Sequence, residues 1–340
     1  MKIQFGLACR VGFVISTSLW LAGCGPRETT TADGNSTTGA AAGGASGKKF
    51  LIGMSQPNKG EPWRQAMNDQ VAAAAAKHPE LTVVFADAGQ NNAKQVADVE
   101  NFLQQKIDLL IISPNEAAPL TDVVSKAYDA GVPVILLDRK VNGEKYTMWI
   151  GANNPNIGKL AGKFAADWCT KNNLKPCRVM ELRGLEGSTP TRDRGDGFRA
   201  GLAANPEAKI IASQNADWLR EKAVSVSQAM LQANPKVDVV YGHNDPMAEA
   251  AIISAQNSGH DLKKMLFVGI DGLPTPDGGI HSVKDGRLGV TFVYPTGGAQ
   301  AIDWAIRILE KKEKPPRAVV LPTEEVTPEN ADAMLVKYGK

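Results

Sequence analysis

The sequence predicts an α/β protein of two lobes, each built on a doubly wound parallel sheet. From Phe50 onward, short apolar runs alternate strictly with longer helical patterns. The apolar runs lack polar alternation, which is typical of parallel strands buried on both faces. The pattern restarts after Asn153-Asn154, and each half is long enough to bury its own core. Two lobes therefore explain the pattern better than one very large sheet.

The elements of each half follow from these runs. In the first half, strands are predicted at 50–54, 81–86, 109–113 and 134–137, and helices at 63–77, 93–105 and 117–130. In the second half, strands are predicted at 178–182, 210–214, 237–241, 266–270 and 289–293, and helices at 158–170, 194–204, 220–232, 247–258 and 299–310. Because ligands of such sheets bind outside the carboxyl ends of the strands, the polar residues at those ends are the candidate site.

The N-terminal segment has the pattern of an export signal. Lys2 and Arg10 precede an apolar stretch at 11–21, and small residues follow. The run Leu21-Ala22-Gly23-Cys24 resembles a bacterial lipobox, which implies lipid attachment at Cys24. We therefore predict a lipoprotein signal peptide at 1–23 and a flexible Gly-, Ser- and Thr-rich tether at 24–48. The alternative is an ordinary cleaved signal with a chance cysteine.

Charge and cysteine content narrow the classes of partner. The signal carries two of the 38 basic residues, so 36 basic and 36 acidic side chains remain and the formal net charge is zero. A balanced surface gives no reason to expect nucleic acid. Cys169 and Cys177 remain in an oxidising compartment, where a disulfide is favoured over two free thiols. Their spacing is not that of a zinc site, and we expect no metal and no cofactor.

Seven motifs in order resemble the ribose-binding branch of periplasmic sugar-binding proteins. They are Phe50-Leu-Ile-Gly-Met-Ser-Gln, Pro62-Trp63-Arg64, Leu136-Leu-Asp-Arg139, Glu181-Leu-Arg-Gly, Arg192-Asp-Arg-Gly-Asp-Gly-Phe198, His243-Asn-Asp245-Pro-Met247 and Gly269-Ile-Asp-Gly272. No single motif is specific, but the ordered set is. Trp63-Arg64, Lys175-Pro-Cys-Arg-Val and the His-Asn-Asp motif look most similar to galactofuranose-binding proteins. Regulators of the lac-repressor type share this core, but here a signal peptide stands in place of their helix-turn-helix.

The resemblance implies a periplasmic binding protein fold of type I, in which two lobes are joined by three hinge crossings. By position, these crossings fall near Asn154, Tyr294 and Thr323. The N-terminal lobe is then 49–153 plus 295–323, and the C-terminal lobe is 154–294 plus 324–340. Closure of the hinge over a ligand is the expected motion.

The resemblance also implies which residues bind the sugar. Asp138, Arg139, Arg192, Asn244 and Asp271 supply carboxylate, guanidinium and amide groups for hydroxyls, and Trp63 and Trp218 supply flat faces. Glu61, Arg64 and Tyr294 complete the predicted set. Some alternatives stay open. Asp138 and Arg139 can form a structural ion pair, Asp271 a turn, Arg194 a surface pair with Asp196, and Tyr294 hinge packing. Tyr294 stands where the ribose-binding pattern has Gln, and His243 is expected beside the site.

The function implied is a lipid-anchored receptor that delivers a monosaccharide, galactofuranose-like or ribose-like, to an ABC permease. No Walker motif is present, so the ATPase is a separate chain. We expect a monomer. A second hypothesis is a sensory protein that presents its ligand to a chemoreceptor or histidine kinase. A glycoside hydrolase using Asp138 and Asp271 is disfavoured, because neighbouring donors are expected to keep both carboxyls ionised.

Overall fold

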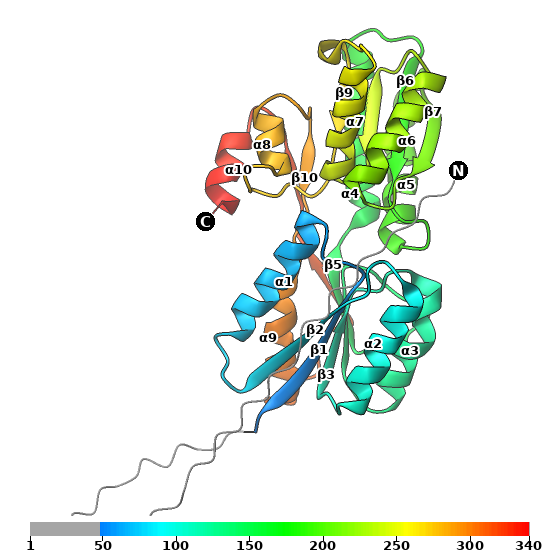
Figure 1. Cartoon of the computed structure of the whole chain (residues 1–340). Coiled ribbons are helices and arrows are strands. Elements are labelled where there is room, and N and C mark those ends of the chain that lie inside the picture. Colours follow the sequence, from blue (N-terminus) through cyan, green and yellow to red (C-terminus); the bar gives the residue numbers. More distant parts are fainter. Residues whose placement is uncertain (1–47, 340) are drawn as a thin grey trace, which may run out of the picture. The chain divides into compact units, whose positions relative to one another are not determined.

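The computed structural model describes residues 48–339 of the chain (Figure 1). The predicted signal peptide, the predicted lipid attachment at Cys24 and nearly all of the predicted tether lie outside these residues. Among the helices of the described part, none is long and apolar enough to cross a membrane.

The first lobe is a six-stranded parallel sheet with helices on both faces (Figure 1). Its strand order is β11-β5-β4-β3-β1-β2. The strands are β1 (Phe50–Gln56), β2 (Leu81–Asp87), β3 (Leu109–Ile112), β4 (Val134–Leu137), β5 (Met148–Ala152) and β11 (Ala318–Leu321). The helices are α1 (Pro62–Ala75), α2 (Asn92–Gln104), α3 (Ala117–Asp129) and α9 (Gly298–Leu309). In β3, Leu109 and Ile111 pack with α1 and α9, whereas Leu110 and Ile112 pack with α2 and α3. The continuous apolar run thus serves both faces, as predicted.

The second lobe repeats this architecture around a four-stranded parallel sheet of order β7-β6-β8-β9. Its strands are β6 (Cys177–Arg183), β7 (Ala208–Asn215), β8 (Val239–Gly242) and β9 (Leu266–Val268). Its main helices are α4 (Asn154–Lys171), α5 (Thr189–Leu202), α6 (Arg220–Ala233) and α7 (Asp245–Asn257). Four short elements and a 3-10 turn complete it, namely α8 (Gly279–Lys284), β10 (Thr291–Val293), β12 (Glu324–Val326), α10 (Ala331–Tyr338) and residues Leu262–Lys264.

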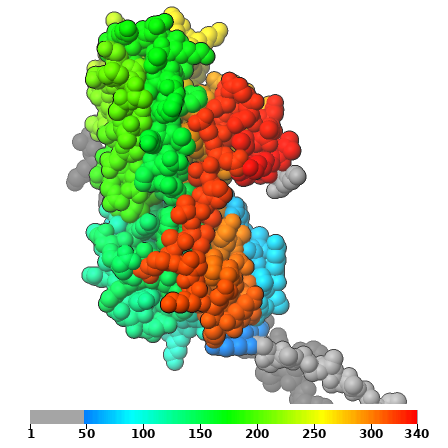
Figure 2. All heavy atoms as spheres, turned by 180° about the vertical axis from the view of Figure 1, so that it is seen from behind, coloured from blue at the N-terminus to red at the C-terminus, as the bar shows by residue number. Residues whose placement is uncertain are grey.

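The chain passes between the two lobes three times. It leaves the first lobe between β5 and α4, returns between β10 and α9, and leaves again between β11 and β12. Viewed from behind, the orange-red segment that holds β11 and β12 runs over the surface from one lobe to the other (Figure 2). The sequence analysis did not predict β5, β11, β12, α8 or α10, because these elements are short and carry little periodic signal.

Glycines bring α4 and α5 of the second lobe into close contact. A Cβ atom at Gly158 or Gly162 would overlap the backbone of α5 at Arg194 or Phe198. A Cβ atom at Gly197 of α5 would likewise overlap the backbone of α4 at Pro155. The reciprocal glycines therefore allow the two backbones to touch, which fixes where the side chains of α5 lie.

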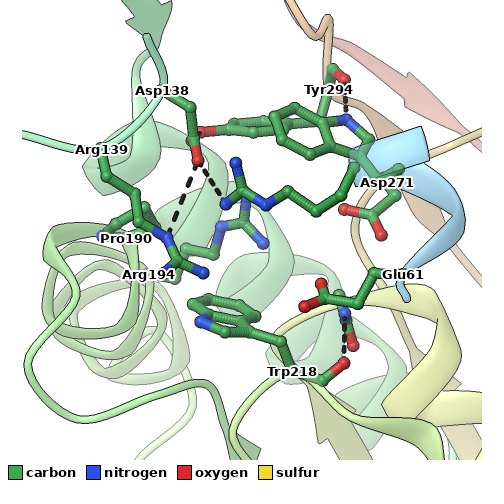
Figure 3. A pocket seen from close by; sticks show the side chains of 11 residues that line it. Glu61, Asp138, Arg139, Pro190, Arg194, Trp218, Asp271 and Tyr294 are labelled. Atoms are coloured by element: carbon green, nitrogen blue, oxygen red, sulfur yellow. Dashed lines mark hydrogen bonds and ion pairs between the residues drawn. The ribbon is translucent and has the colours of Figure 1, made fainter. Parts of the chain in front are cut away.

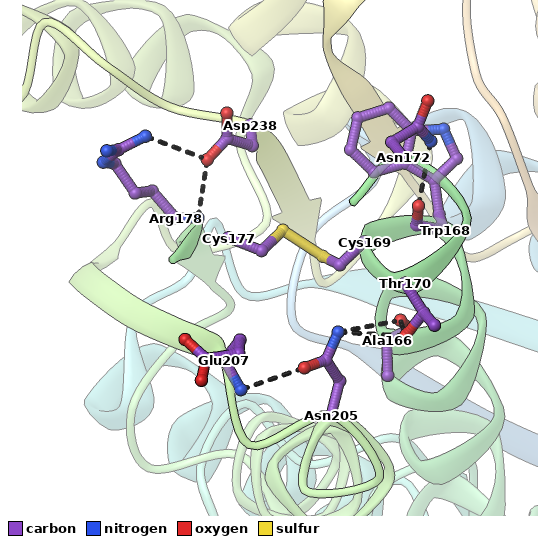
Figure 4. The surroundings of a disulfide bond; sticks show 10 residues. All are labelled: Ala166, Trp168, Cys169, Thr170, Asn172, Cys177, Arg178, Asn205, Glu207 and Asp238. Atoms are coloured by element: carbon purple, nitrogen blue, oxygen red, sulfur yellow. Dashed lines mark hydrogen bonds and ion pairs between the residues drawn. A yellow bond between two sulfur atoms is a disulfide. The ribbon is translucent and has the colours of Figure 1, made fainter. Parts of the chain in front are cut away.

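A disulfide joins Cys169, near the end of α4, to Cys177 at the start of β6, with Cα atoms 5.9 Å apart (Figure 4). Both half-cystines are fully buried. Next to the bond, the carboxylate of Asp238 accepts a hydrogen bond from the backbone N–H of Arg178 at 2.7 Å. The disulfide therefore links the two ends of the loop between α4 and β6.

Candidate functional site

A cavity between the two lobes collects most of the predicted site residues (Figure 3). It encloses about 290 Å³ of empty space and is lined by Glu61, Trp63, Arg64, Asp138, Arg139, Pro190, Arg194, Trp218, Asn244, Asp271 and Tyr294. Nine of the ten predicted ligand-binding residues are therefore in this lining. Pro190 and Arg194 were not predicted.

Arg192 is the predicted residue that does not line the cavity. Its side chain is 67% exposed and pairs with Asp193 at 2.8 Å. Arg194, which was considered for a surface pair with Asp196, is buried and lines the cavity instead. The inward face of α5 carries Thr191, Arg194 and Phe198, spaced three and four apart, so a residue one position after Thr191 must point outward.

Asp138, at the end of β4, is the carboxylate that pairs with the two arginines of the first lobe. Its Oδ2 atom lies 2.8 Å from Nη2 of Arg64 and 3.9 Å from Nε of Arg139. Burial opposes ionisation, but Arg64 and Arg139 outweigh it and hold the pKa of the Asp138 carboxyl below its usual value. Its backbone has a φ of 67°, in the left-handed region that costs energy for most residues. The carboxylate faces the other side chains of the cavity (Figure 3).

Arg64 and Arg139 are both buried, and each keeps an unused donor. Arg64 donates to Ser113 at 2.9 Å and Arg139 donates to the carbonyl of Asn115 at 2.8 Å. Within the described residues, the Nε–H groups of both arginines have no hydrogen-bond partner. Burial and the charge of Arg64 lower the pKa of Arg139 to about 9, which still leaves it protonated at neutral pH. Buried donors without partners are rare, so a ligand acceptor is the natural partner here.

Two indoles form flat walls from opposite lobes. Trp63, at the start of α1, donates from Nε1 to the carbonyl of Tyr294 at 2.7 Å and packs on the Tyr294 ring with centroids 5.2 Å apart. Trp218, in the loop between β7 and α6, has a φ of 74°. The guanidinium of Arg194 lies 5.3 Å from the Trp218 ring and 4.4 Å from the Tyr294 ring. Aromatic faces of this kind suit the C–H faces of a ring-shaped polar ligand.

Arg194 is fixed by partners in its own lobe. Its Nε donates to Oδ1 of Asn154 at 2.8 Å, and its Nη1 donates to the carbonyl of His243. The His243 ring lies outside the lining and bonds Glu181 at 3.0 Å. Burial raises the pKa of Glu181, but the hydrogen bond and charge of His243 dominate and lower it to about 2. His243 therefore contributes to the site indirectly, because its carbonyl holds Arg194 while its ring is bonded to Glu181.

Asp271 offers an acceptor from the second lobe. Its carboxyl has no hydrogen-bond partner in the described residues and is almost fully buried. Burial first, and then the nearby charge of Asp245, raise its pKa well above the usual value, against the effect of Arg194. The donors expected to lower the pKa of Asp271 are therefore outweighed by burial and by the neighbouring Asp245. Asn244 caps α7 through Oδ1 and donates to the carbonyl of Trp218 at 3.1 Å.

The arrangement is suited to binding a small neutral polyhydroxylated ring. Three guanidinium groups face three carboxyl groups, which together offer donors and acceptors to the hydroxyls of such a ring. Unused donors on the first lobe face the Asp271 carboxyl on the second, and both lobes contribute an indole. Within residues 48–339, no group of His, Cys, Asp and Glu side chains could hold a metal ion.

A model of the periplasmic binding protein domain family matches residues 52–313. The chain belongs to this family. Such proteins act outside the cytoplasm and bind solutes, so the family argues against the hydrolase hypothesis for this periplasmic binding protein.

Several characterised relatives are similar over most of their length. The chain is 32% identical over 244 residues to the ribose import binding protein RbsB of Bacillus subtilis, which covers 72% of this chain and 76% of the relative. It is 34% identical over 231 residues to the galactofuranose-binding protein YtfQ of Escherichia coli, and the match covers 66% of this chain and 72% of the relative.

Solved structures show the same fold. The fructose-binding periplasmic domain of a hybrid two-component system matches with a TM-score of 0.80 and 40% identity, covering 85% of this chain and 94% of that domain. A galactofuranose-binding protein matches with a TM-score of 0.79 and 29% identity, and the match covers 85% of this chain and 98% of that protein.

Proposed function

We propose that this periplasmic binding protein captures a monosaccharide between its lobes and delivers it to an ABC importer. The observation that carries the proposal is the pair of opposed polar walls in one cavity. Nε of Arg64 and Nε of Arg139 are buried donors without a partner in the described residues, and the Asp271 carboxyl lines the opposite wall. A sugar hydroxyl can both donate and accept, so a ring with several hydroxyls satisfies both walls at once.

The lining of the cavity supports a single sugar unit. Polar groups and indoles from both lobes converge on one small space. Relatives that bind ribose and galactofuranose, and a neighbour solved with β-D-fucofuranose, support a furanose or pentose ligand. Trp63 with Arg64 favours a galactofuranose-like sugar for this chain.

A thermal-shift screen against furanoses, pyranoses and pentoses, followed by calorimetry, tests the proposal. A ligand at one hundred times its Kd stabilises the folded form by about 2.7 kcal/mol. We expect a clear shift with one sugar, which is recovered chemically unchanged. No shift across the panel would contradict sugar binding.

A sensory role is the second candidate, and one comparison favours it. The neighbour at 40% identity is the fructose-binding domain of a hybrid two-component system. The same cavity serves either role, so binding data do not separate them. Deletion of the gene does: loss of labelled sugar uptake supports transport, whereas normal uptake with a lost transcriptional response supports sensing.

We also propose that Cys24 carries the lipid that anchors the protein, and that the protein acts as a monomer. The lipobox-like run before Cys24 supports the anchor. Metabolic labelling with a fatty acid tests it: wild-type protein should incorporate the label, and Cys24→Ala should not. Light scattering of the purified protein tests the monomer.

A further inference from the structure

Three hydrogen bonds join loops of the two lobes outside the sugar cavity. Nε2 of Gln90 donates to the carbonyl of Asp217 at 3.1 Å. The backbone N–H of Ala117 donates to the carbonyl of Gly187 at 2.9 Å, and that of Lys140 donates to Oγ1 of Thr189 at 3.1 Å. None of these residues lines the cavity, so their bonds do not depend on which sugar is bound.

The Gln90 contact holds the loop that carries the Trp218 indole. Gln90, Asp217 and Trp218 have φ angles of 58°, 54° and 74°, so both partners of the bond lie in turns that non-glycine residues rarely adopt. Gln90 is itself anchored, because its backbone N–H donates to the carbonyl of Pro57 at 2.6 Å. A bond to the residue next to Trp218 therefore fixes the position of the indole relative to the first lobe.

The Gly187 contact requires the absence of a side chain. Ala117 is the first residue of α3, where backbone N–H groups have no partner within the helix, and the Gly187 carbonyl supplies one. A Cβ atom at Gly187 would overlap the Glu116 side chain, at 2.6 Å from its Cγ. Glu116 is held there by Nδ2 of Asn92 at 2.6 Å. With Glu116 in this position, a side chain at position 187 would therefore push the two lobes apart.

We propose that these two contacts, Gln90–Asp217 and Ala117–Gly187, form an inter-lobe clasp that positions Trp218 over the bound sugar and slows its release. The inference rests on the proposed sugar binding. Gln90 and Gly187 act as positioning residues, since neither reaches the cavity. Breaking the clasp favours the open form, so it raises the dissociation rate by the same factor for every sugar.

The variant Gln90→Met keeps the length of the side chain and removes the donor. Stopped-flow tryptophan fluorescence on the full chain should show a dissociation rate about three- to tenfold higher, because one hydrogen bond is lost. The association rate should stay within twofold of the wild type. The dissociation rates of tightly and weakly bound sugars should rise by the same factor. Gln65→Met is the control, because the side chain of Gln65 donates to Asp69 in its own helix α1 and makes no bond to the second lobe in the described residues. An unchanged dissociation rate, or a change that differs between sugars, would overturn the role of Gln90.

The second test needs no sugar. In hydrogen exchange of the ligand-free chain, the peptide that contains Ala117 should exchange faster in Gly187→Val than in the wild type. Glu116→Ala in the same chain removes the clash and should restore slow exchange. Slow exchange in Gly187→Val, or a double variant that stays fast, would overturn the clasp. If no sugar binds the wild type, the proposed function fails while this test still decides whether the clasp exists.

Discussion

The hydroxyl of Tyr294 donates to Oδ1 of Asp138 at 2.6 Å and accepts from Nδ2 of Asn154 at 3.0 Å. Oδ1 of Asn154 in turn accepts from Nε of Arg194 at 2.8 Å. A continuous chain of hydrogen bonds therefore links a carboxylate of the first lobe to an arginine of the second. It passes through residues at two of the three hinge crossings, so the ligand groups and the hinge share one network.

Tyr294→Phe should weaken both the fold and sugar binding. The substitution leaves Oδ1 of buried Asp138 without its donor, and Nδ2 of Asn154 keeps only the carbonyl of Ala152 at 3.5 Å. An unpartnered buried group costs about 1–3 kcal/mol of unfolding free energy. We expect affinity to fall about tenfold, because Asp138 then keeps its arginine partners but loses the hydrogen bond that holds its other oxygen. Urea unfolding and calorimetry measure the two effects. Tyr128→Phe, at a 41% exposed tyrosine, is the control and should change neither. Equal behaviour of the two variants would contradict the network.

Arg194→Ala and Arg192→Ala separate two neighbouring arginines. Arg194 lines the cavity and Arg192 is exposed, so the first change should lower affinity at least a hundredfold and the second less than twofold. Arg194→Lys should also bind poorly, because an ammonium cannot reproduce the fork that reaches Asn154 and His243. Calorimetry decides. A larger loss with Arg192→Ala would mean that α5 is rotated relative to the structure.

Gly197→Ala should destabilise the second lobe. The new methyl would overlap the carbonyl of Pro155 in α4, and forcing atoms into a packed interface typically costs about 1–3 kcal/mol. Because α4 and α5 carry Asn154 and Arg194, affinity should fall as well. Gly60→Ala is the control, since no atom lies within 4 Å of its Cβ position. Thermal unfolding of both variants measures the effect, and equal stabilities would rule out the close helix contact.

Removing the disulfide should lower stability without changing the site. The bond closes a short loop, with Cys169 and Cys177 separated by eight positions, so chain entropy alone predicts a loss of about 2–3 kcal/mol. The double change of Cys169 and Cys177 to Ala should unfold at lower urea, and reductant should shift the wild type but not the variant. Sugar affinity measured well below the unfolding transition should match the wild type, because neither cysteine lines the cavity.

The Asp245–Asp271 pair should make stability depend on pH. Burial raises the pKa of Asp245 to about 7, and Asp271 is raised as well. A carboxyl whose pKa is higher in the folded state contributes its full stability below its unfolded pKa, near 4, and loses it as the pH rises toward 7. Asp271→Asn removes one charge, so stability should fall less between pH 4 and 7 than in the wild type. Urea unfolding across this range compares them, and parallel curves would contradict the coupling.

Much of the site was predictable because strand ends in parallel sheets converge at one edge. Asp138 and Asp271 follow buried apolar runs, and the α/β alternation placed both near a ligand. The choice between Arg192 and Arg194 was not predictable in this way. It depends on the rotation of α5, which the close contact of its glycines with α4 fixes.

Local patterns were enough to predict the two α/β lobes, the order of their main strands and helices, and nine of the eleven residues that line the cavity. These follow from periodicity and from residue types at strand ends. Which side chains are already hydrogen-bonded, and which are left for a ligand, depends on the folded arrangement. The hydroxyl of Tyr294 is already hydrogen-bonded to Asp138 and Asn154, whereas Nε of Arg139 has no partner in the described residues. That distinction depends on partners far away in the chain and on left-handed backbone turns at Asp138 and Trp218, which no local pattern encodes.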